Sequence, residues 1–185
     1  MEYTLEQRAA FIISECEKCN STDPYKIFHS IANNDHIRMH GPEHHVLDGA
    51  CILAAFYNAG GKINLHESLI RLMNEGLRMP GGVCGLWGVC GAVTSIGAAL
   101  AIIDGTGPLS SEDWSSHMEY TSSALSELSK TGGPRCCKRD AFISMKEAVK
   151  YIFKNYEVVL DISDIKCDFS ALNNQCIGER CPFKR

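Results

Sequence analysis

The sequence predicts a mainly α fold: a single-domain helical bundle around a buried Gly/Ala-rich central helix, with an irregular, cysteine-containing C-terminal tail. Three observations predict it. Apolar residues recur at helical spacing through most of the chain. Capping residues, proline and glycine stand where these segments begin and end. A charge-free run over residues 79–103 closes with residues 96–103, an apolar stretch typical of a core helix.

The overall composition indicates one domain spanning residues 1–185. The 185 residues are 45% apolar and 22% charged, which are ordinary values for a chain with its own core. The net charge of −4 offers no basic surface, so nucleic acid is not an expected partner. The first residues are amphipathic and acidic rather than a signal peptide, and we expect a cytoplasmic protein.

Four helices are predicted before the charge-free run, each from an apolar stripe between start and stop signals. Proline is favoured in the first turn, where its missing N–H costs nothing, and glycine is favoured just past the end. The four segments are residues 4–17, residues 24–33, Gly41-Pro42 to Gly60-Gly61, and Asn64 to Leu77.

Two more helices and a tail are predicted after the run. A serine-rich helix is expected from a cap at Ser110 or Ser111 to about residue 129, and another over residues 139–156. Residues 157–162 form either a single short strand or an extended tail. Asparagine and glycine mark turns farther on, so the C-terminal part is expected to be irregular.

The charge-free run is long enough to span a bilayer, but its composition favours a core helix. It contains six glycines, and only about fifteen residues near its end are persistently apolar, too few for a span. Gly88, Gly91, Ser95 and Ala99 recur at helical spacing, which predicts a smooth stripe for close helix packing. We therefore expect a soluble domain with no membrane association.

A cluster of histidines and carboxylates opens the predicted third helix. His40 precedes the helix, and Glu43, His44 and His45 occupy its first turn. Asp48 follows His44 by four residues, so both share a face, where a carboxylate orients the imidazole or raises its basicity. We predict His44, Glu43 and Asp48 as proton-handling catalytic residues. The alternative is polar decoration of an exposed first turn.

Ten cysteines are the main anomaly of the composition. In a secreted chain an even number indicates disulfides, but this chain is long enough for a core and opens without an export signal. Metal ligation or redox chemistry is therefore the expected use. Cys16 and Cys19 form a C-x2-C pair, a spacing typical of one half of a metal site. The alternative is a purely structural pair, with one thiol buried on a helix and the other exposed in the next turn.

The predicted metal site joins cysteines from separate segments. Cys84 and Cys90 lie in the glycine-rich part of the charge-free run, and Cys136 and Cys137 lie in a Gly-Pro turn before a helix. Basic neighbours and the helix N-terminus are expected to lower the pKa of the adjacent pair. The predicted ligands are Cys84, Cys90, Cys136 and Cys137, with Cys176 and Cys181 as supplementary ligands or a second site.

The expected cofactor is an iron–sulfur cluster, with zinc as the alternative. Soft thiolates in this number select these metals. Gly81 and Gly82 lead into the cysteines and are predicted to be cofactor-binding, because backbone amides approach the sulfides of a cluster closely where side chains are absent.

Four motifs carry a resemblance to a known group: HGPEHH (residues 40–45), MPGGVCGLWGVCGA (79–92), GGPRCC (132–137) and the Cys181-Pro182 pair. The chain resembles an uncharacterised family of small cysteine-rich proteins from anaerobic bacteria and archaea, a domain of unknown function. The resemblance implies which positions form a site and implies no activity. The adjacent cysteines also resemble the CCG domains of heterodisulfide reductases, but Lys138 replaces their glycine and no ligand is carried over.

These features predict a cysteine-ligated metal or iron–sulfur protein that acts in electron or sulfur transfer, with a redox or sulfur-transfer protein as partner. One alternative is a metal-free enzyme with Cys84 or Cys137 as nucleophile and His44 or His45 as base. Another is a zinc-stabilised helical interaction module. The main prediction requires the distant cysteine segments to meet at the mouth of the central helix.

Overall fold

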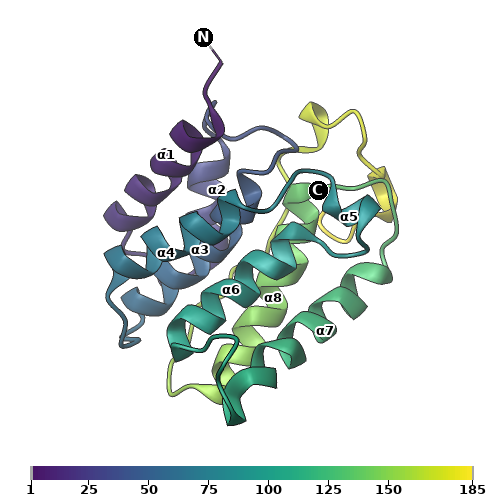
Figure 1. Ribbon diagram of the computed structural model, residues 1–185. Helices are drawn as coiled ribbons and strands as arrows, with labels where there is room; N and C mark the ends of the chain where they lie inside the picture. The colour runs from purple at the N-terminus through teal and green to yellow at the C-terminus, as the bar shows by residue number, and fades with distance from the viewer. Residues whose placement is uncertain (1, 185) are drawn as a thin grey trace.

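The computed structural model describes residues 2–184 as one all-α domain (Figure 1). The mainly α prediction is therefore confirmed. Two short 3-10 turns, η2 (Ser170–Leu172) and η3 (Gly178–Arg180), lie in the tail, and η1 (Glu112–Ser115) precedes α7. The α-helices in these residues are α1 (Leu5–Lys18), α2 (Pro24–Ala32), α3 (His44–Asn58), α4 (Leu65–Leu77), α5 (Val83–Leu86), α6 (Gly91–Asp104), α7 (Ser116–Ser129) and α8 (Cys137–Asn155).

Local capping explains where several helices begin. Thr4 and Gln7 form a capping box at the start of α1, in which each side chain accepts a hydrogen bond from the other's backbone N–H. At α2, Asp23 accepts hydrogen bonds from two backbone N–H groups, and Pro24 stands in the first turn. Gly105 closes α6 in the left-handed region.

Two helices, rather than one, form the centre of the bundle. The predicted Gly/Ala-rich helix is α6, which packs against α3, α4, α7 and α8. Its partner α3 is buried along most of its length and contacts α1, α2, α4, α6 and α8. The two come close where Gly49 of α3 faces Ser95 of α6, and the Gly49 N–H donates to Ser95 Oγ at 2.9 Å. Small residues at this contact permit the approach.

The predicted small-residue stripe is confirmed in part. Gly91, Ser95 and Ala99 are buried on α6, which begins five residues before the predicted apolar stretch. Gly88 lies outside the helix, exposed and with a φ of +68°. The stripe therefore starts at the first residue of α6, and the preceding loop reaches the surface.

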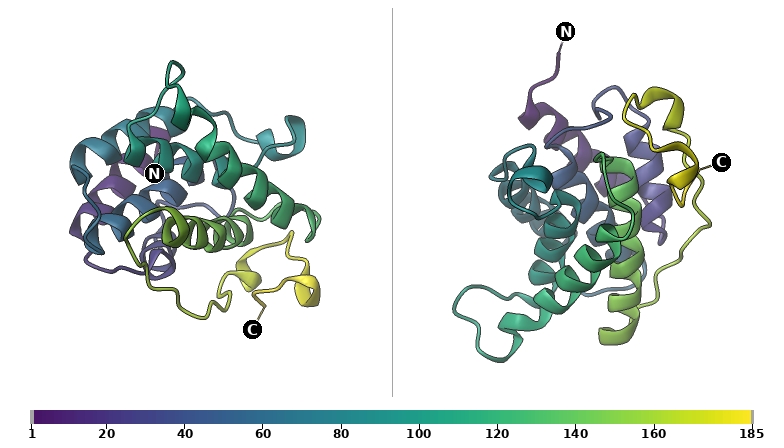
Figure 2. Two further views of the ribbon diagram at one scale, coloured as in Figure 1. Left: turned by 90° about the horizontal axis from the view of Figure 1, so that it is seen from below. Right: turned by 90° about the vertical axis from the view of Figure 1, so that its right-hand side faces the viewer.

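The tail after α8 is irregular, as predicted. Residues 157–162 are extended, and one isolated bridge, between Cys167 and Lys184, is the only strand-like pairing within residues 2–184. In both views of Figure 2 the yellow tail lies on the outside of α8. The tail therefore covers one side of α8 without a sheet of its own.

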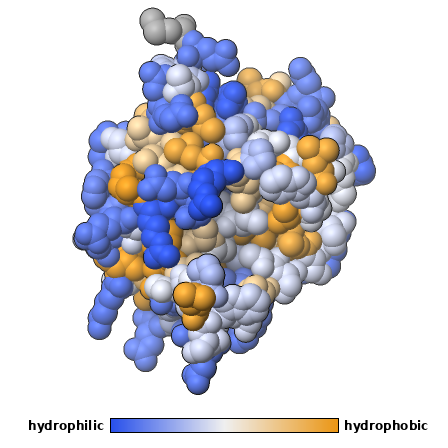
Figure 3. Space-filling view, viewed as in Figure 1, coloured by the Kyte–Doolittle hydropathy of each residue, from blue (hydrophilic) through white to orange (hydrophobic). Residues whose placement is uncertain are grey.

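The surface and the lengths of the helices show whether any helix could span a membrane. On the face shown in Figure 3, apolar atoms form small separate patches among polar side chains. Across residues 2–184, every helix is too short or too polar to cross a bilayer. The charge-free run is divided between α5, a loop and α6.

Candidate functional site

The three segments that carry the predicted site converge on one cavity of about 260 Å³. α3, α6 and α8 all begin at its wall, and α5 closes another side. Such convergence of helix N-termini favours negative charge in the cavity. The chemically active side chains of the wall are three thiols (Cys84, Cys90, Cys137), three imidazoles (His40, His44, His45) and two carboxylates (Asp48, Asp140).

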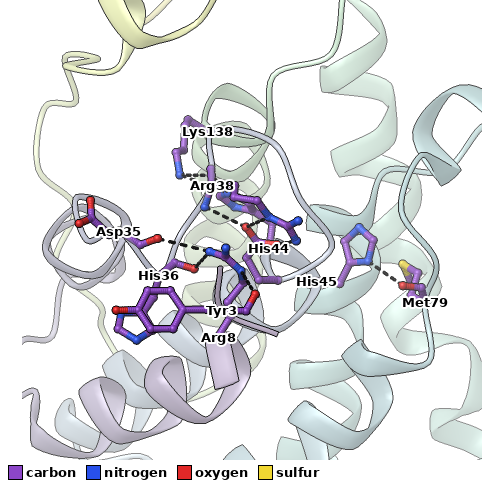
Figure 4. Close-up of polar contacts among 10 residues, drawn as sticks. Tyr3, Arg8, Asp35, His36, Arg38, His44, His45, Met79 and Lys138 are labelled. Carbon is purple, nitrogen blue, oxygen red and sulfur yellow. Dashed lines mark hydrogen bonds and ion pairs between the residues drawn. The ribbon is translucent and has the colours of Figure 1, made fainter. Parts of the chain in front are cut away.

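His45 presents a free ring nitrogen at this wall. Its Nδ1 donates a hydrogen bond to the carbonyl of Met79 at 3.2 Å (Figure 4). That bond leaves Nε2 as an acceptor, the arrangement found in metal-binding histidines. Gly91 lies against the ring and has room only for hydrogen there. Burial lowers the pKa of His45, so the ring is neutral and able to accept a proton or a metal.

His44 joins Lys138 to Asp48 in the interior. The Lys138 Nζ lies 3.2 Å from His44 Nε2 and donates to the Arg38 carbonyl at 3.1 Å, and Figure 4 shows the lysine reaching down onto this group. His44 Nε2 also lies 3.3 Å from the Arg38 carbonyl oxygen, so this nitrogen stands between a donor and an acceptor. His44 Nδ1 is 3.5 Å from Asp48 Oδ1. Burial lowers the pKa of Lys138 to about 8 and lowers the pKa of His44 well below its usual value.

Asp48 is the most unusual side chain of the site. It is 0% exposed, and neither carboxylate oxygen has a hydrogen-bond partner among residues 2–184. Burial raises its pKa well above the usual range. The Nδ1 atoms of His40 and His44 likewise lack hydrogen-bond partners in the described chain. Buried polar atoms are normally satisfied, so this group of atoms points to a missing partner.

Glu43 has a different place from the one predicted. It is fully buried but lies outside the cavity wall. Its carboxylate accepts hydrogen bonds from the backbone N–H, Nε and Nη2 of Arg38, the last at 2.7 Å. Burial pushes the pKa of Glu43 up, but these bonds more than offset it and hold the pKa at about 2. Glu43 therefore fixes the loop before α3, and the exposed-first-turn alternative is wrong.

The thiols are less acidic than predicted, which corrects the expected activation of the adjacent pair. Burial raises the pKa of Cys137 to about 12 and also raises that of Cys136. The basic neighbours are occupied elsewhere: Arg139 donates to Asp140 at 3.0 Å, and Lys138 faces His44. Desolvation therefore outweighs the helix N-terminus.

Cys90 is also held in its neutral form. Its pKa is raised, first by burial and then by the Asp140 carboxylate, which lies 3.9 Å from Sγ as a hydrogen-bond acceptor. The raised pKa values keep the thiols of Cys90 and Cys137 protonated at neutral pH.

The predicted cysteines separate into two groups. Cys84, Cys90 and Cys137 line the cavity together with Gly81 and Gly82. Cys136 faces a different hollow, which it shares with Cys167, Cys176 and Cys181. Cys136 caps α8 in an extended conformation while Cys137 is already helical, so the neighbouring side chains point apart. Cys167 was not among the predicted ligands, although it precedes Cys176 by nine residues in the same tail.

The cavity is open to the outside. Cys84, Cys90, Arg135 and Asp140 also line a surface groove of about 710 Å³ between the α5 loop and the turn after α7. A molecule entering the groove therefore meets two of the thiols. In residues 2–184, no three His, Cys, Asp or Glu side chains are already grouped around a single metal-ion position.

Comparison with known proteins gives one match. A model of a family of unknown function (DUF5714) matches residues 12–184. No curated protein and no solved structure matches the chain.

Proposed function

The chain belongs to this family of unknown function (DUF5714), and we propose that its cavity binds a thiolate-held metal or iron–sulfur centre used in electron or sulfur transfer. Cys84, Cys90 and Cys137 are the proposed ligands, and His44 and Asp48 the proton-handling neighbours. The same proposal includes a reducing cytoplasm and an anaerobic cell, because both protect thiols from oxidation. It also includes a redox or sulfur-transfer protein as partner.

The buried carboxyl group of Asp48, which makes no hydrogen bond in the described chain, carries this proposal. Burying a polar group without a hydrogen bond costs about 2 to 7 kcal/mol, and strongly perturbed titratable groups cluster at functional sites. Asp48 is 0% exposed, and both its oxygens lack hydrogen-bond partners in the described chain. A cation in the adjoining cavity would offset that cost by direct attraction.

The donor set fits a thiophilic metal. Three thiols from two segments of the chain line one wall, and thiolates favour zinc and iron–sulfur clusters over hard cations. Metal binding displaces thiol protons, and His45 Nε2 is an acceptor at the same wall. Gly81 and Gly82 leave the backbone accessible there. A bound iron–sulfur centre would supply one-electron chemistry or hold transferable sulfur.

Anaerobic purification tests the proposal. We expect iron with acid-labile sulfide, or another thiophilic metal, and its loss in a Cys84→Ser, Cys90→Ser, Cys137→Ser variant. Cys19→Ser serves as a control, because Cys19 is half-buried and lies outside both thiol groups. Equal metal content in the triple variant and the control would contradict the proposal that the metal binds in the cavity.

A metal-free thiol enzyme is the second candidate. Cys84 lies where the cavity meets the groove, within reach of an entering substrate, and His45 presents an unprotonated Nε2 at the cavity wall. In that case His45, rather than His44, is the base, because His44 Nε2 is engaged by Lys138. A colourless, metal-free protein with one hyper-reactive thiol would favour this enzyme, and stoichiometric zinc without labile sulfide would favour an interaction module.

Replacing Asp48 separates binding from stability. Because its oxygens make no hydrogen bond in the described chain, we expect Asp48→Asn to change the unfolding free energy of the chelator-treated protein by less than about 1 kcal/mol. Metal affinity should fall about 10- to 100-fold, as for other groups that tune a site. Chemical denaturation and metal titration measure the two effects.

Asp104→Asn is the matched control. Asp104 accepts hydrogen bonds from His117 Nε2 and the Tyr156 hydroxyl, both at 2.9 Å. Its replacement should lower stability by about 1 kcal/mol and leave metal affinity unchanged. If Asp48→Asn instead behaves like Asp104→Asn in both measurements, Asp48 is a structural carboxylate.

A further inference from the structure

A second group of thiols lies between α8 and the tail, away from the cavity. Cys136 at the start of α8 shares a small hollow with three tail cysteines: Cys167, Cys176 and Cys181. The hollow measures about 20 Å³, and its wall includes the apolar side chains of Met39, Phe142, Phe169, Ile177 and Phe183. In both views of Figure 2 the yellow tail that carries these cysteines lies against the outside of α8. Four cysteines therefore line one largely apolar space, and in the described residues their side chains are not yet grouped around one metal-ion position.

Several of these sulfur atoms already receive hydrogen bonds. The amide nitrogen of Asn173, a buried side chain, lies 3.5 Å from Cys136 Sγ, and the backbone N–H of Gly178 donates to Cys176 Sγ at 3.4 Å. Burial raises the pKa of Cys167, and a hydrogen bond from the backbone N–H of Phe169 opposes that rise. In metal–thiolate sites, N–H donors to sulfur orient the ligands and offset their charge.

The tail contributes few fully buried side chains to the core. Of residues 157–184, only Leu160, Phe169 and Asn173 are buried. Strand-like pairing within that segment is limited to the Cys167–Lys184 bridge. Val158, Ile165 and Phe183 pack against the core while partly exposed, and a metal or cross-link would add to these anchors. The spacing C-x4-C between Cys176 and Cys181 also falls within the range of structural zinc sites.

We propose that Cys136, Cys167, Cys176 and Cys181 bind a second thiophilic metal centre, a zinc ion or an iron–sulfur cluster, that fastens the tail to α8. The thiols release their protons to solvent as the metal binds. This centre is independent of the cavity site, because the two share no ligand. The two sites are adjacent in sequence, because Cys136 belongs to the tail site and Cys137 belongs to the cavity site.

Cobalt(II) titration of the full-length chain tests the second site. The protein is purified anaerobically, stripped with a chelator under reducing conditions and titrated with Co²⁺, which reports thiolate ligation through charge-transfer absorption. We expect a Cys176→Ser, Cys181→Ser variant to lose one thiolate-bound cobalt per chain relative to the wild type. A Cys84→Ser, Cys90→Ser variant should keep that cobalt. Equal thiolate–cobalt absorption in the wild type and the Cys176/Cys181 variant would overturn the second site.

Thiol protection on the wild-type chain gives an answer that does not depend on variants. As purified, Cys136, Cys167, Cys176 and Cys181 should resist alkylation together and become reactive together after chelation, as read by mass spectrometry. Tryptic cleavage at Lys166 and Arg180 should slow about 100-fold at a metal concentration of ~100 times Kd. Alkylation of all four at the same rate before and after chelation would also overturn the proposal. Iron with acid-labile sulfide in the Cys84/Cys90 variant identifies a cluster, and zinc identifies a single ion.

Discussion

Glu43→Gln is expected to lower the unfolding free energy by about 2 to 3 kcal/mol at pH 7. Removing one partner of a buried ion pair costs about 3 to 5 kcal/mol, and solvent at the Arg38 end, whose side chain is 40% exposed, reduces that cost. Arg38 binds Glu43 through its backbone N–H and two guanidinium nitrogens. The variant leaves these donors with a neutral amide and loosens the loop that leads into α3.

The loss should depend on pH with a definite sign. The pKa of Glu43 is about 2 in the fold against an ordinary value of 4.5. Its stabilisation is therefore complete above pH 4.5 and disappears as the pH falls toward 2. Urea denaturation at pH 7 and pH 3 should show the difference between wild type and variant narrowing at the lower pH.

An exposed ion pair provides the control for Glu43. Glu75 pairs with Arg78 at 3.1 Å, with both side chains at least half exposed. Glu75→Gln should change stability by less than about 0.5 kcal/mol at either pH. A pH-independent loss in Glu43→Gln would mean that the side chain stabilises the fold by packing rather than by charge.

Gly49→Ala is expected to destabilise the fold by about 3 kcal/mol, the upper end for overpacked cores. A Cβ at Gly49 would lie 2.5 Å from the backbone carbonyl oxygen of Ser95, and a backbone oxygen cannot move aside without shifting α6. Glycine to alanine inside a helix otherwise stabilises by about 0.5 to 1 kcal/mol. The sign of the change in unfolding free energy therefore reports how closely α3 packs on α6. Thermal or urea denaturation measures this change.

Gly97→Ala is the matched control on α6. Its Cβ would meet only a side-chain methyl group, that of Thr121 at 2.9 Å, and no backbone atom. We expect a change within about 1 kcal/mol in either direction. If both variants lower the unfolding free energy by the same amount, the α3–α6 contact is looser than the structure indicates.

Local sequence signals accounted for most of the fold. Asp23 with Pro24 starts α2, and Asn64 caps α4, as predicted. The apolar stripes also identified the helices themselves. They did not reveal that α3 shares the centre with α6, because a polar first turn is compatible with either a buried site or an exposed surface. Whether a histidine-rich turn is buried depends on which helices pack over it, and the helical period does not encode that.

The site residues were predicted less completely. The three predicted segments line one cavity, but the acidity of the thiols and the grouping of the cysteines differ from the prediction. Basic neighbours predicted a lowered pKa for Cys137, whereas burial raises it to about 12. Cys167 lines the second hollow although it was left out. Burial and side-chain direction set both outcomes, and both depend on distant parts of the chain.

By itself, the sequence determined the helices, the glycine-rich loop and the identity of the segments that carry thiols and imidazoles, because caps, apolar spacing and side-chain chemistry are local properties. Only the tertiary structure decided that Asp48 is buried without a hydrogen bond in the described chain, that Lys138 faces His44, and that Cys136 and Cys137 line different hollows. These features arise from desolvation and from the directions in which packed helices point their side chains.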